Sequence, residues 1–377
     1  MHQSEEQIGG AQGAAFTVSS RFPLLLWAVT RASLLLFGWM SLWLAPGGPR
    51  DAFPHEAAAL RPYPALEALC RWDCGWYLRI AEHGYSSSVD ANIWPLYPLA
   101  ARALAVLTRM PVPFALLAVS NAACLGAYVL VYRVFARAEG EQAARWGLAL
   151  FAAFPFAYFQ GCAYPESMMV LFSAWAIWLA DRGRPLWAGA MLGVGALARH
   201  MVILAGAATL GAQLRQHGFS FVKRRGVFGL VLPFLLVALY PLTLWLSIGQ
   251  PLAFATARVN GWGEVAWWSV LHPLLAHNPD GRYTVYAIFS LVPGVGVAFL
   301  FARRRWELGA FAALLMIVCW AIGAEALGRY AAGCWPAFLP LGVFLARRPL
   351  WQAPAVAFFA LFQGLFFFLF IHGYSIV

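Results

Sequence analysis

The chain has 377 residues, of which 62% are hydrophobic and only 11% are charged. Soluble proteins carry about 25% charged residues, so this composition excludes a soluble enzyme, a disordered regulator and a dedicated nucleic-acid-binding domain. The net charge of +10 does not point to nucleic acid, because the basic residues cluster in short loops between apolar segments, as in membrane proteins. We therefore expect an all-α polytopic membrane protein in which the few remaining charges indicate the function.

The first 21 residues are predicted to form a polar cytoplasmic tail, because they lack the basic start and cleavage site of a signal peptide. The apolar run at 22–45 is too long for a signal peptide and is predicted to be an uncleaved spanning helix. Residues 22–377 are then expected to form a single transmembrane domain of about eleven spans. The ten further spans are predicted at 114–134, 146–160, 167–180, 185–198, 201–214, 227–248, 284–302, 308–326, 331–345 and 354–371.

The basic loops predict the orientation of these spans. Basic residues concentrate at 133–145, 182–184, 215–225, 303–305 and 347–348. With eleven spans and a cytoplasmic N-terminus, all of these loops fall inside, as the positive-inside bias requires. The segment 96–109 would reverse the alternation if it crossed the membrane, so we expect it to be an interfacial helix on the outer face.

The unusual polar sequence collects in the predicted outer loops. The first outer loop (46–113) is expected to contain short amphipathic helices, and the second covers 250–282. We therefore predict a multi-pass protein of the inner (cell) membrane whose active site faces the periplasm.

The densest group of polar and aromatic residues lies at 71–85 in the first outer loop. As a helix, this segment places Trp72 and Trp76 on one face and Asp73 and Tyr77 on the adjacent face. Two interpretations of Asp73 remain open. Its carboxylate either caps the helix by accepting a backbone N–H, or acts as a general base at the membrane surface.

Three predicted outer turns carry further charges. Pro165 suits the first position of a helix, so Glu166 falls in the first turn, where the helix dipole stabilises an anion. The alternative for Glu166 is an active-site carboxylate that binds a sugar hydroxyl or a metal. Arg199 and Arg329 either snorkel to the lipid headgroups or bind a phosphate, and Arg31, inside the first span, is a weaker candidate of the same kind.

The six cysteines include no CxxC pair and no Cys/His cluster with zinc spacing. Cys70 and Cys74 are four residues apart, which suits one helix face but is awkward for a disulfide. We expect most of the cysteines to be small core residues.

Several of these segments resemble a known family. Residues 71–85 (Arg-Trp-Asp-x-x-x-Tyr-x-x-Ile-Ala-x-x-Gly-Tyr) and 94–98 (Trp-Pro-Leu-Tyr-Pro) are similar to motifs of the PIG-V family of GPI mannosyltransferases and its bacterial relatives. Residues 164–167 (Tyr-Pro-Glu-Ser) and 328–330 (Gly-Arg-Tyr), with Pro336 shortly after, resemble later elements of the same family.

The resemblance implies a GT-C glycosyltransferase with the GT-C-type fold, which transfers a sugar, in this family mannose, from a polyprenyl-phosphate donor to a lipid or glycan acceptor. Asp73 would be the general base of an inverting reaction at the extracytoplasmic face, among membrane lipids and with no nucleic-acid partner. The implied sugar and acceptor contacts are Trp72, Tyr77, Tyr164, Glu166 and His200. The implied contacts to the donor phosphate are Arg71, Arg199 and Arg329.

No cofactor is certain. A divalent metal held by Asp73, Glu166 and His200 and a metal-free phosphate site built on arginine are both open. Two other functions also remain open. A transporter or flippase of a lipid-linked sugar needs polar groups near the bilayer midplane, where Arg31 is the clearest. A non-catalytic scaffold needs no outer polar cluster, so charges that lie far apart in the folded chain would favour it.

Overall fold

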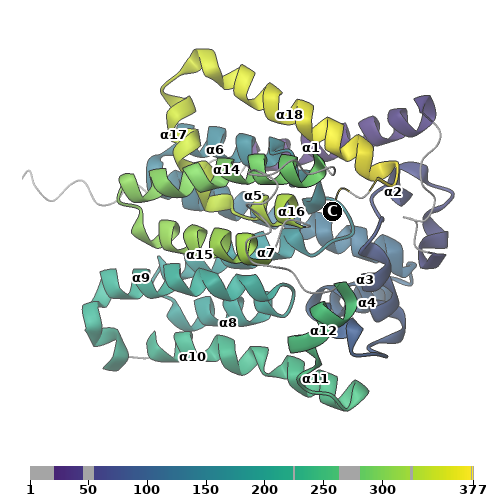
Figure 1. Ribbon diagram of the computed structural model, residues 1–377. Helices are drawn as coiled ribbons and strands as arrows, with labels where there is room; N and C mark the ends of the chain where they lie inside the picture. Colours follow the sequence, from purple (N-terminus) through teal and green to yellow (C-terminus); the bar gives the residue numbers. More distant parts are fainter. Residues whose placement is uncertain are drawn as a thin grey trace, which may run out of the picture.

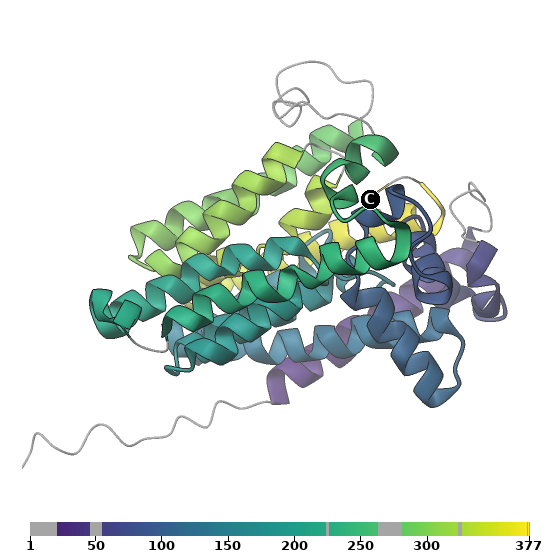
Figure 2. The ribbon, with the colours of Figure 1, turned by 90° about the horizontal axis from the view of Figure 1, so that it is seen from below.

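The computed structural model describes residues 21–45, 55–223, 226–262, 281–322, 326–374 and 376. Every regular element in these ranges is helical, and the chain is an all-α polytopic membrane protein, as its composition predicts. Its long helices lie roughly side by side, and the short helices α2, α3, α4 and α12 gather at one end (Figure 1). The second view shows the first outer loop and α12 at the same end (Figure 2).

Three predicted regions lie wholly or partly outside the described residues. They are the N-terminal tail (1–20), the start of the first outer loop (46–54) and most of the second outer loop (263–280).

Five helical segments are long and apolar enough to cross a bilayer within the described ranges. They are α1 (Arg21–Leu44), α5 (Val112–Glu139), the continuous pair α10 (Gly226–Val237) and α11 (Leu239–Ile248), α14 (Gly281–Ala302) and α18 (Pro349–Ile371). The break between α10 and α11 has a local cause. Pro241 has no N–H to donate to the carbonyl of Val237, and its ring crowds that carbonyl.

The other predicted spans also contain helices, but these are shorter. They are α6 (Glu141–Ala153), α7 (Glu166–Ala180), α8 (Pro185–Ala196), α9 (Gly206–His217), α15 (Trp306–Ile322) and α17 (Phe338–Ala346). At about 1.5 Å per residue, none of these reaches across a hydrocarbon core of ~30 Å. Several of these spans are completed by separate turns: η4 (Ala157–Gln160), η5 (His200–Ala205), α16 (Leu327–Ala331) and η8 (Trp335–Ala337).

Small residues let some of these helices pack backbone against backbone. A Cβ added to Gly189 in α8 would lie 2.0 Å from the carbonyl oxygen of Gly229 in α10. A Cβ added to Gly342 in α17 would lie 2.3 Å from the carbonyl oxygen of Ala143 in α6. Such close approach is how helices associate where the lipid provides no hydrophobic driving force.

The predicted first outer loop folds onto one end of the bundle. Its elements are η2 (His55–Leu60), α2 (Pro64–Glu67), α3 (Cys74–His83), η3 (Val89–Asn92) and α4 (Leu96–Thr108), and α12 (Ala253–Trp262) packs beside them. The prediction of short helices in this loop is therefore confirmed, and the segment predicted at 96–109 is helical. Two backbone hydrogen bonds attach the loop to the bundle, from Ala163 N to Leu69 O at 3.0 Å and from Leu96 N to Leu197 O at 2.8 Å.

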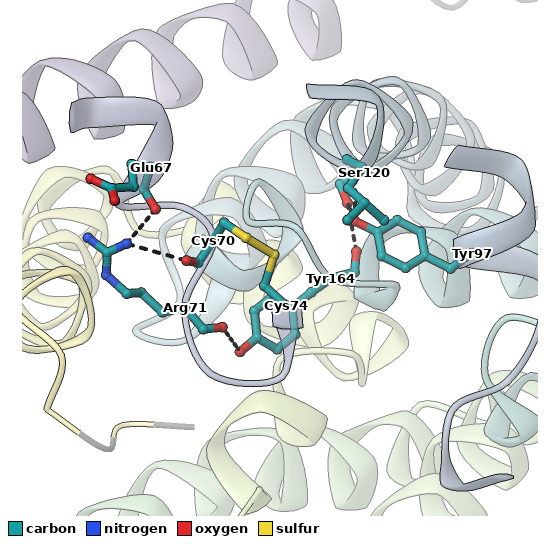
Figure 3. Close-up of a disulfide and its surroundings, with 8 residues drawn as sticks. Glu67, Cys70, Arg71, Cys74, Tyr97, Ser120 and Tyr164 are labelled. Atoms are coloured by element: carbon teal, nitrogen blue, oxygen red, sulfur yellow. Dashed lines mark hydrogen bonds between the residues drawn. A yellow bond between two sulfur atoms is a disulfide. The ribbon is translucent and has the colours of Figure 1, made fainter. Parts of the chain in front are cut away.

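Cys70 and Cys74 form a disulfide (Figure 3), so the prediction that this pair is unbridged was wrong. That prediction placed both cysteines on one helix, whereas α3 begins only at Cys74. Trp72 has a φ of 53°, a left-handed conformation that is uncommon outside glycine. It turns the chain so that the two Cα atoms lie 5.2 Å apart. Trp72 consequently precedes the helix and is not part of the predicted aromatic face.

The other four cysteines, all of them buried, agree with the prediction of small core residues.

The basic turns lie at the opposite end of the bundle, where ion pairs connect them. Arg303 and Arg305 both bond Glu139 at the end of α5, at 2.7 and 2.9 Å. Arg215 bridges Asp181 at 2.7 Å and Glu307 at 3.2 Å. The two ends of the bundle therefore differ in chemistry, one rich in loop-borne polar and aromatic groups and the other rich in arginine.

Candidate active site

Four charged residues that are far apart in the sequence meet at the loop-covered end of the bundle. The Nη1 group of Arg329 donates to Oδ2 of Asp73 at 2.8 Å, across 256 residues of sequence. The Nε atom of Arg329 lies 3.3 Å from Oε1 of Glu166, and Arg199 donates to the same Glu166 oxygen. Two carboxylates and two guanidinium groups thus form one charge-balanced network, which we call the outer ion network.

The local sequence explains where the two carboxylates stand. Asp73 occupies the N-cap position of α3, but its side chain makes no capping hydrogen bond, so the capping interpretation is right in position and wrong in role. Its carboxylate turns to Arg329 instead. Glu166 lies in the first turn of α7, as predicted, with Pro165 one residue earlier than expected, at the N-cap.

Burial makes the pairing in this network necessary. The side chains of Glu166 and Arg329 are only 3% and 5% exposed, and a buried charge without a partner costs several kcal/mol. Aromatic rings complete the surroundings, since the guanidinium of Arg329 lies 5.3 Å from the ring centre of Tyr164 and 5.2 Å from that of Tyr330. Asp73 is the most accessible member, with 21% of its side chain exposed, so it is the carboxylate that a bound molecule can reach.

A cavity of about 300 Å³ opens beside the network, at the small end of the range for small-molecule sites. Asp73, Arg199 and Arg329 line it together with Trp72 and Tyr77. Burial raises the pKa of Tyr77, which keeps its hydroxyl protonated and able to donate a hydrogen bond. The cavity therefore combines a carboxylate, cations, aromatic faces and a neutral hydroxyl.

Two further arginines line the same cavity and were not among the predicted site residues. Arg258 comes from α12 and Arg282 from the start of α14. The sequence signal that points to Arg199 and Arg329 applies to these two residues as well, since positive charge in a predicted outer loop opposes the usual bias. With these two residues, the described lining holds four arginines and one carboxylate, and Glu166 stands directly behind it.

Four of the predicted contact residues lie outside the cavity lining. The guanidinium of Arg71 donates to the backbone carbonyls of Glu67 and Cys70 (Figure 3) and of Ile371. The hydroxyl of Tyr164 donates to the carbonyl of Arg71 at 2.9 Å. These bonds hold the turn that carries Asp73.

The other two of these residues, Glu166 and His200, differ in their contact with the network. Glu166 reaches the cavity only through its arginine partners. His200 is exposed, and its ring packs 5.4 Å from the ring of Trp94.

A second buried acid orders the loop in front of the cavity. Asp90 is fully buried and accepts hydrogen bonds from the N–H groups of Ser86 and Ser87 at 2.8 and 2.9 Å, and from Arg79. Burial alone would raise the pKa of Asp90, but the bonds from Ser86 and Ser87 and the charge of Arg79 outweigh it and lower the pKa below its usual range. This cluster holds η3, whose end supplies Asn92 to the cavity wall.

The described residues do not fit a divalent cation. They contain no group of three or more His, Cys, Asp and Glu side chains placed to hold a metal. The carboxylates of Asp73 and Glu166 already accept hydrogen bonds from arginine.

The comparisons with known proteins found one family. The family model described as Mannosyltransferase (PIG-V) matches residues 14–225, more than half of the chain. The matched range contains Asp73, Glu166 and Arg199, whereas Arg258 and Arg329 lie beyond it. No curated protein and no solved structure matches the chain.

Proposed function

Because the chain belongs to the PIG-V mannosyltransferase family, and is thus a membrane mannosyltransferase, we propose that it transfers mannose from a polyprenyl-phosphate donor to an acceptor hydroxyl. In this proposal the enzyme is of the GT-C type, Asp73 is the general base, and the reaction takes place in the cavity beside the outer ion network.

The position of Asp73 is the observation that carries the proposal. A general base must come within hydrogen-bond reach of the proton that it abstracts, and Asp73 is the partly exposed carboxylate on the cavity wall. Arg329 holds the carboxylate through Oδ2. Among the described residues no hydrogen bond to Oδ1 is formed, which leaves that oxygen to accept the proton of the acceptor hydroxyl.

The proposed reaction is a single inverting displacement. The acceptor oxygen attacks the anomeric carbon of mannose while its proton moves to Asp73. The bond from that carbon to the phosphate oxygen breaks, and the lipid phosphate leaves with the electron pair. Because Arg199 and Arg329 are already balanced by Glu166 and Asp73, we assign most of the stabilisation of the leaving phosphate to Arg258, a further arginine of the cavity lining.

Two features support an extracytoplasmic site. The disulfide Cys70–Cys74 lies next to Asp73, and disulfides persist in oxidising compartments. The turns that carry Arg215, Arg303 and Arg305 lie at the other end of the bundle from α3 and α12 (Figure 1), as the positive-inside bias requires if the cavity faces outward. Both features agree with an active site on the periplasmic side of a bacterial inner membrane.

The test is the variant Asp73→Asn, assayed in liposomes with a polyprenyl-phospho-mannose donor. General-base catalysis contributes about 10²–10⁴-fold to a rate, so we expect a loss of at least 100-fold. Glu82→Gln is the matched control, because Glu82 is an acid on the same helix outside the cavity lining. If Asp73→Asn retained full activity, the assignment of the base would fail.

The other two functional hypotheses have less support. A non-catalytic scaffold would not need four charged residues to meet in one network, as Asp73, Glu166, Arg199 and Arg329 do. A flippase needs a polar path through the bilayer, and the buried Arg31 side chain, which makes no hydrogen bond within the described ranges, does not make a path by itself. Measuring translocation and transfer in the same liposomes separates a flippase from a transferase.

A further inference from the structure

A second concave surface lies on the side of the bundle formed by α1, α5, α7 and α8. It is a groove of about 880 Å³ with almost entirely apolar walls. Its lining includes Trp175, with 38% of its surface exposed, and Trp187, with 63% exposed. The groove therefore opens outward from the bundle and is not an internal cavity.

The length of the groove corresponds to one leaflet. Along α5 its lining runs from Ala122 to Arg133, which at about 1.5 Å per residue is roughly 16 Å. Half of a ~30 Å hydrocarbon core is about 15 Å. Because Arg133 lies toward the arginine-rich end of α5, the groove covers the half of the membrane on that side.

Arginines surround the end of the groove at the membrane surface. Arg133 and Arg184 line it directly, and Arg182 lies beside it with its guanidinium 3.7 Å from the ring centre of Trp178. Arg137 is attached to the same turn by a 3.3 Å hydrogen bond to the carbonyl of Asp181.

These arginines lie close enough to influence one another. Burial, followed by the charges of Arg137 and Arg133, lowers the pKa of Arg182. The one carboxylate in this turn, Asp181, pairs at 2.7 Å with Arg215 from α9. The cluster therefore carries positive charge that the described residues leave uncompensated.

We propose that this groove binds an anionic glycerophospholipid from the leaflet on the arginine-rich side. An acyl chain lies along the apolar walls between Ala122 and Arg133, and the headgroup phosphate lies between Arg133 and Arg184, which can bind it through paired N–H groups. A zwitterionic lipid would fill the walls but leave the excess charge uncompensated, and a soluble anion would leave the walls empty. Basic pockets between spanning helices on the cytoplasmic side bind anionic headgroups in this way.

The test uses full-length protein reconstituted in nanodiscs with equal amounts of phosphatidylglycerol and phosphatidylcholine, followed by mass spectrometry of the lipids that remain bound. For the wild type we expect about a 30-fold preference for phosphatidylglycerol at one retained lipid, as two arginines near the surface provide. Arg133→Gln combined with Arg184→Gln should reduce the preference to below about 3-fold. Arg347→Gln combined with Arg348→Gln is the matched control, because it removes the same charge from another basic turn.

A second variant tests the apolar part independently of charge. Ala122→Trp fills the groove at its deep end, where Ala122 is exposed, and should remove the retained lipid whatever its headgroup. Three results would each overturn the proposal: no preference in the wild type, an equal loss in the Arg347/Arg348 control, or retention of the lipid by the Ala122 variant. An equal loss in the control would assign the preference to the basic surface in general.

Discussion

The variant Arg329→Gln tests the outer ion network most directly. In the wild type, two carboxylates and two guanidinium groups balance to zero net charge. Removing Arg329 leaves Asp73, Glu166 and Arg199 with a net charge of −1, in a region where the Glu166 side chain is only 3% exposed. Breaking a buried ion pair from one side costs about 3–5 kcal/mol. Arg199 still compensates Glu166, so we expect the lower end, about 3 kcal/mol.

The assay is thermal unfolding in detergent, followed by tryptophan fluorescence, with transferase activity measured on the same preparations. Adding Asp73→Asn to Arg329→Gln returns the net charge of the network to zero and leaves the pair of Arg199 and Glu166 intact, so the double variant should recover much of the lost stability. Its activity should stay low, because the proposed base Asp73 is replaced and its 2.8 Å bond to Arg329 is lost. If the double variant were no more stable than Arg329→Gln alone, the reasoning from charge balance would be refuted.

Three further predictions concern other parts of the site. Arg258→Gln should lower kcat/KM for the lipid-phosphate donor by about 10–100-fold, as expected for the loss of a hydrogen bond to a charged group. The control variant Arg109→Gln, at the exposed end of α4, should leave kcat/KM unchanged, and donor titrations measure both values. The pKa of Asp90 is lowered in the folded protein, so the stabilisation from its ionised carboxylate is fully present at neutral pH and is lost as the pH falls below about 4. In acid-unfolding measurements, lowering the pH should therefore reduce the stability of the wild type more than that of Asp90→Asn. Replacing both Cys70 and Cys74 by Ala should reduce activity several-fold, because the bridge closes the turn that carries the proposed base, and unchanged turnover would contradict this role.

The positions of the helices could be predicted from the sequence because of the membrane itself. A bilayer excludes unpaired backbone groups and most charges, so apolar runs such as 114–134 and 354–371 predict helices directly, and both occur. The same exclusion makes a charge near the outer end of a span unusual. That is why Glu166, Arg199 and Arg329 could be singled out before their proximity was known, whereas Asp73 stood out through the dense polar and aromatic residues around it at 71–85.

The free-energy cost of placing charges in the bilayer did not indicate which helices would be too short to cross it. Helix length depends on where packing and local turns interrupt the chain, as η4 and η5 do for α6 and α9. Nor could spacing reveal the disulfide. Whether Cys70 can reach Cys74 depends on the backbone at Trp72, which adopts a conformation that the helical pattern does not predict.

By itself the sequence determined that the protein is helical, that it lies in a membrane, and which few charges outside the basic loops need an explanation, because hydration energies act on each residue separately. Only the tertiary structure decided which charges are partners. Arg329 and Asp73 are 256 residues apart, and a bond between them depends on how whole helices pack. In the same packing, the side chain of Arg71 lies outside the cavity and bonds backbone carbonyls. Arg258 and Arg282 line the cavity instead, because α12 and α14 pack next to the first outer loop.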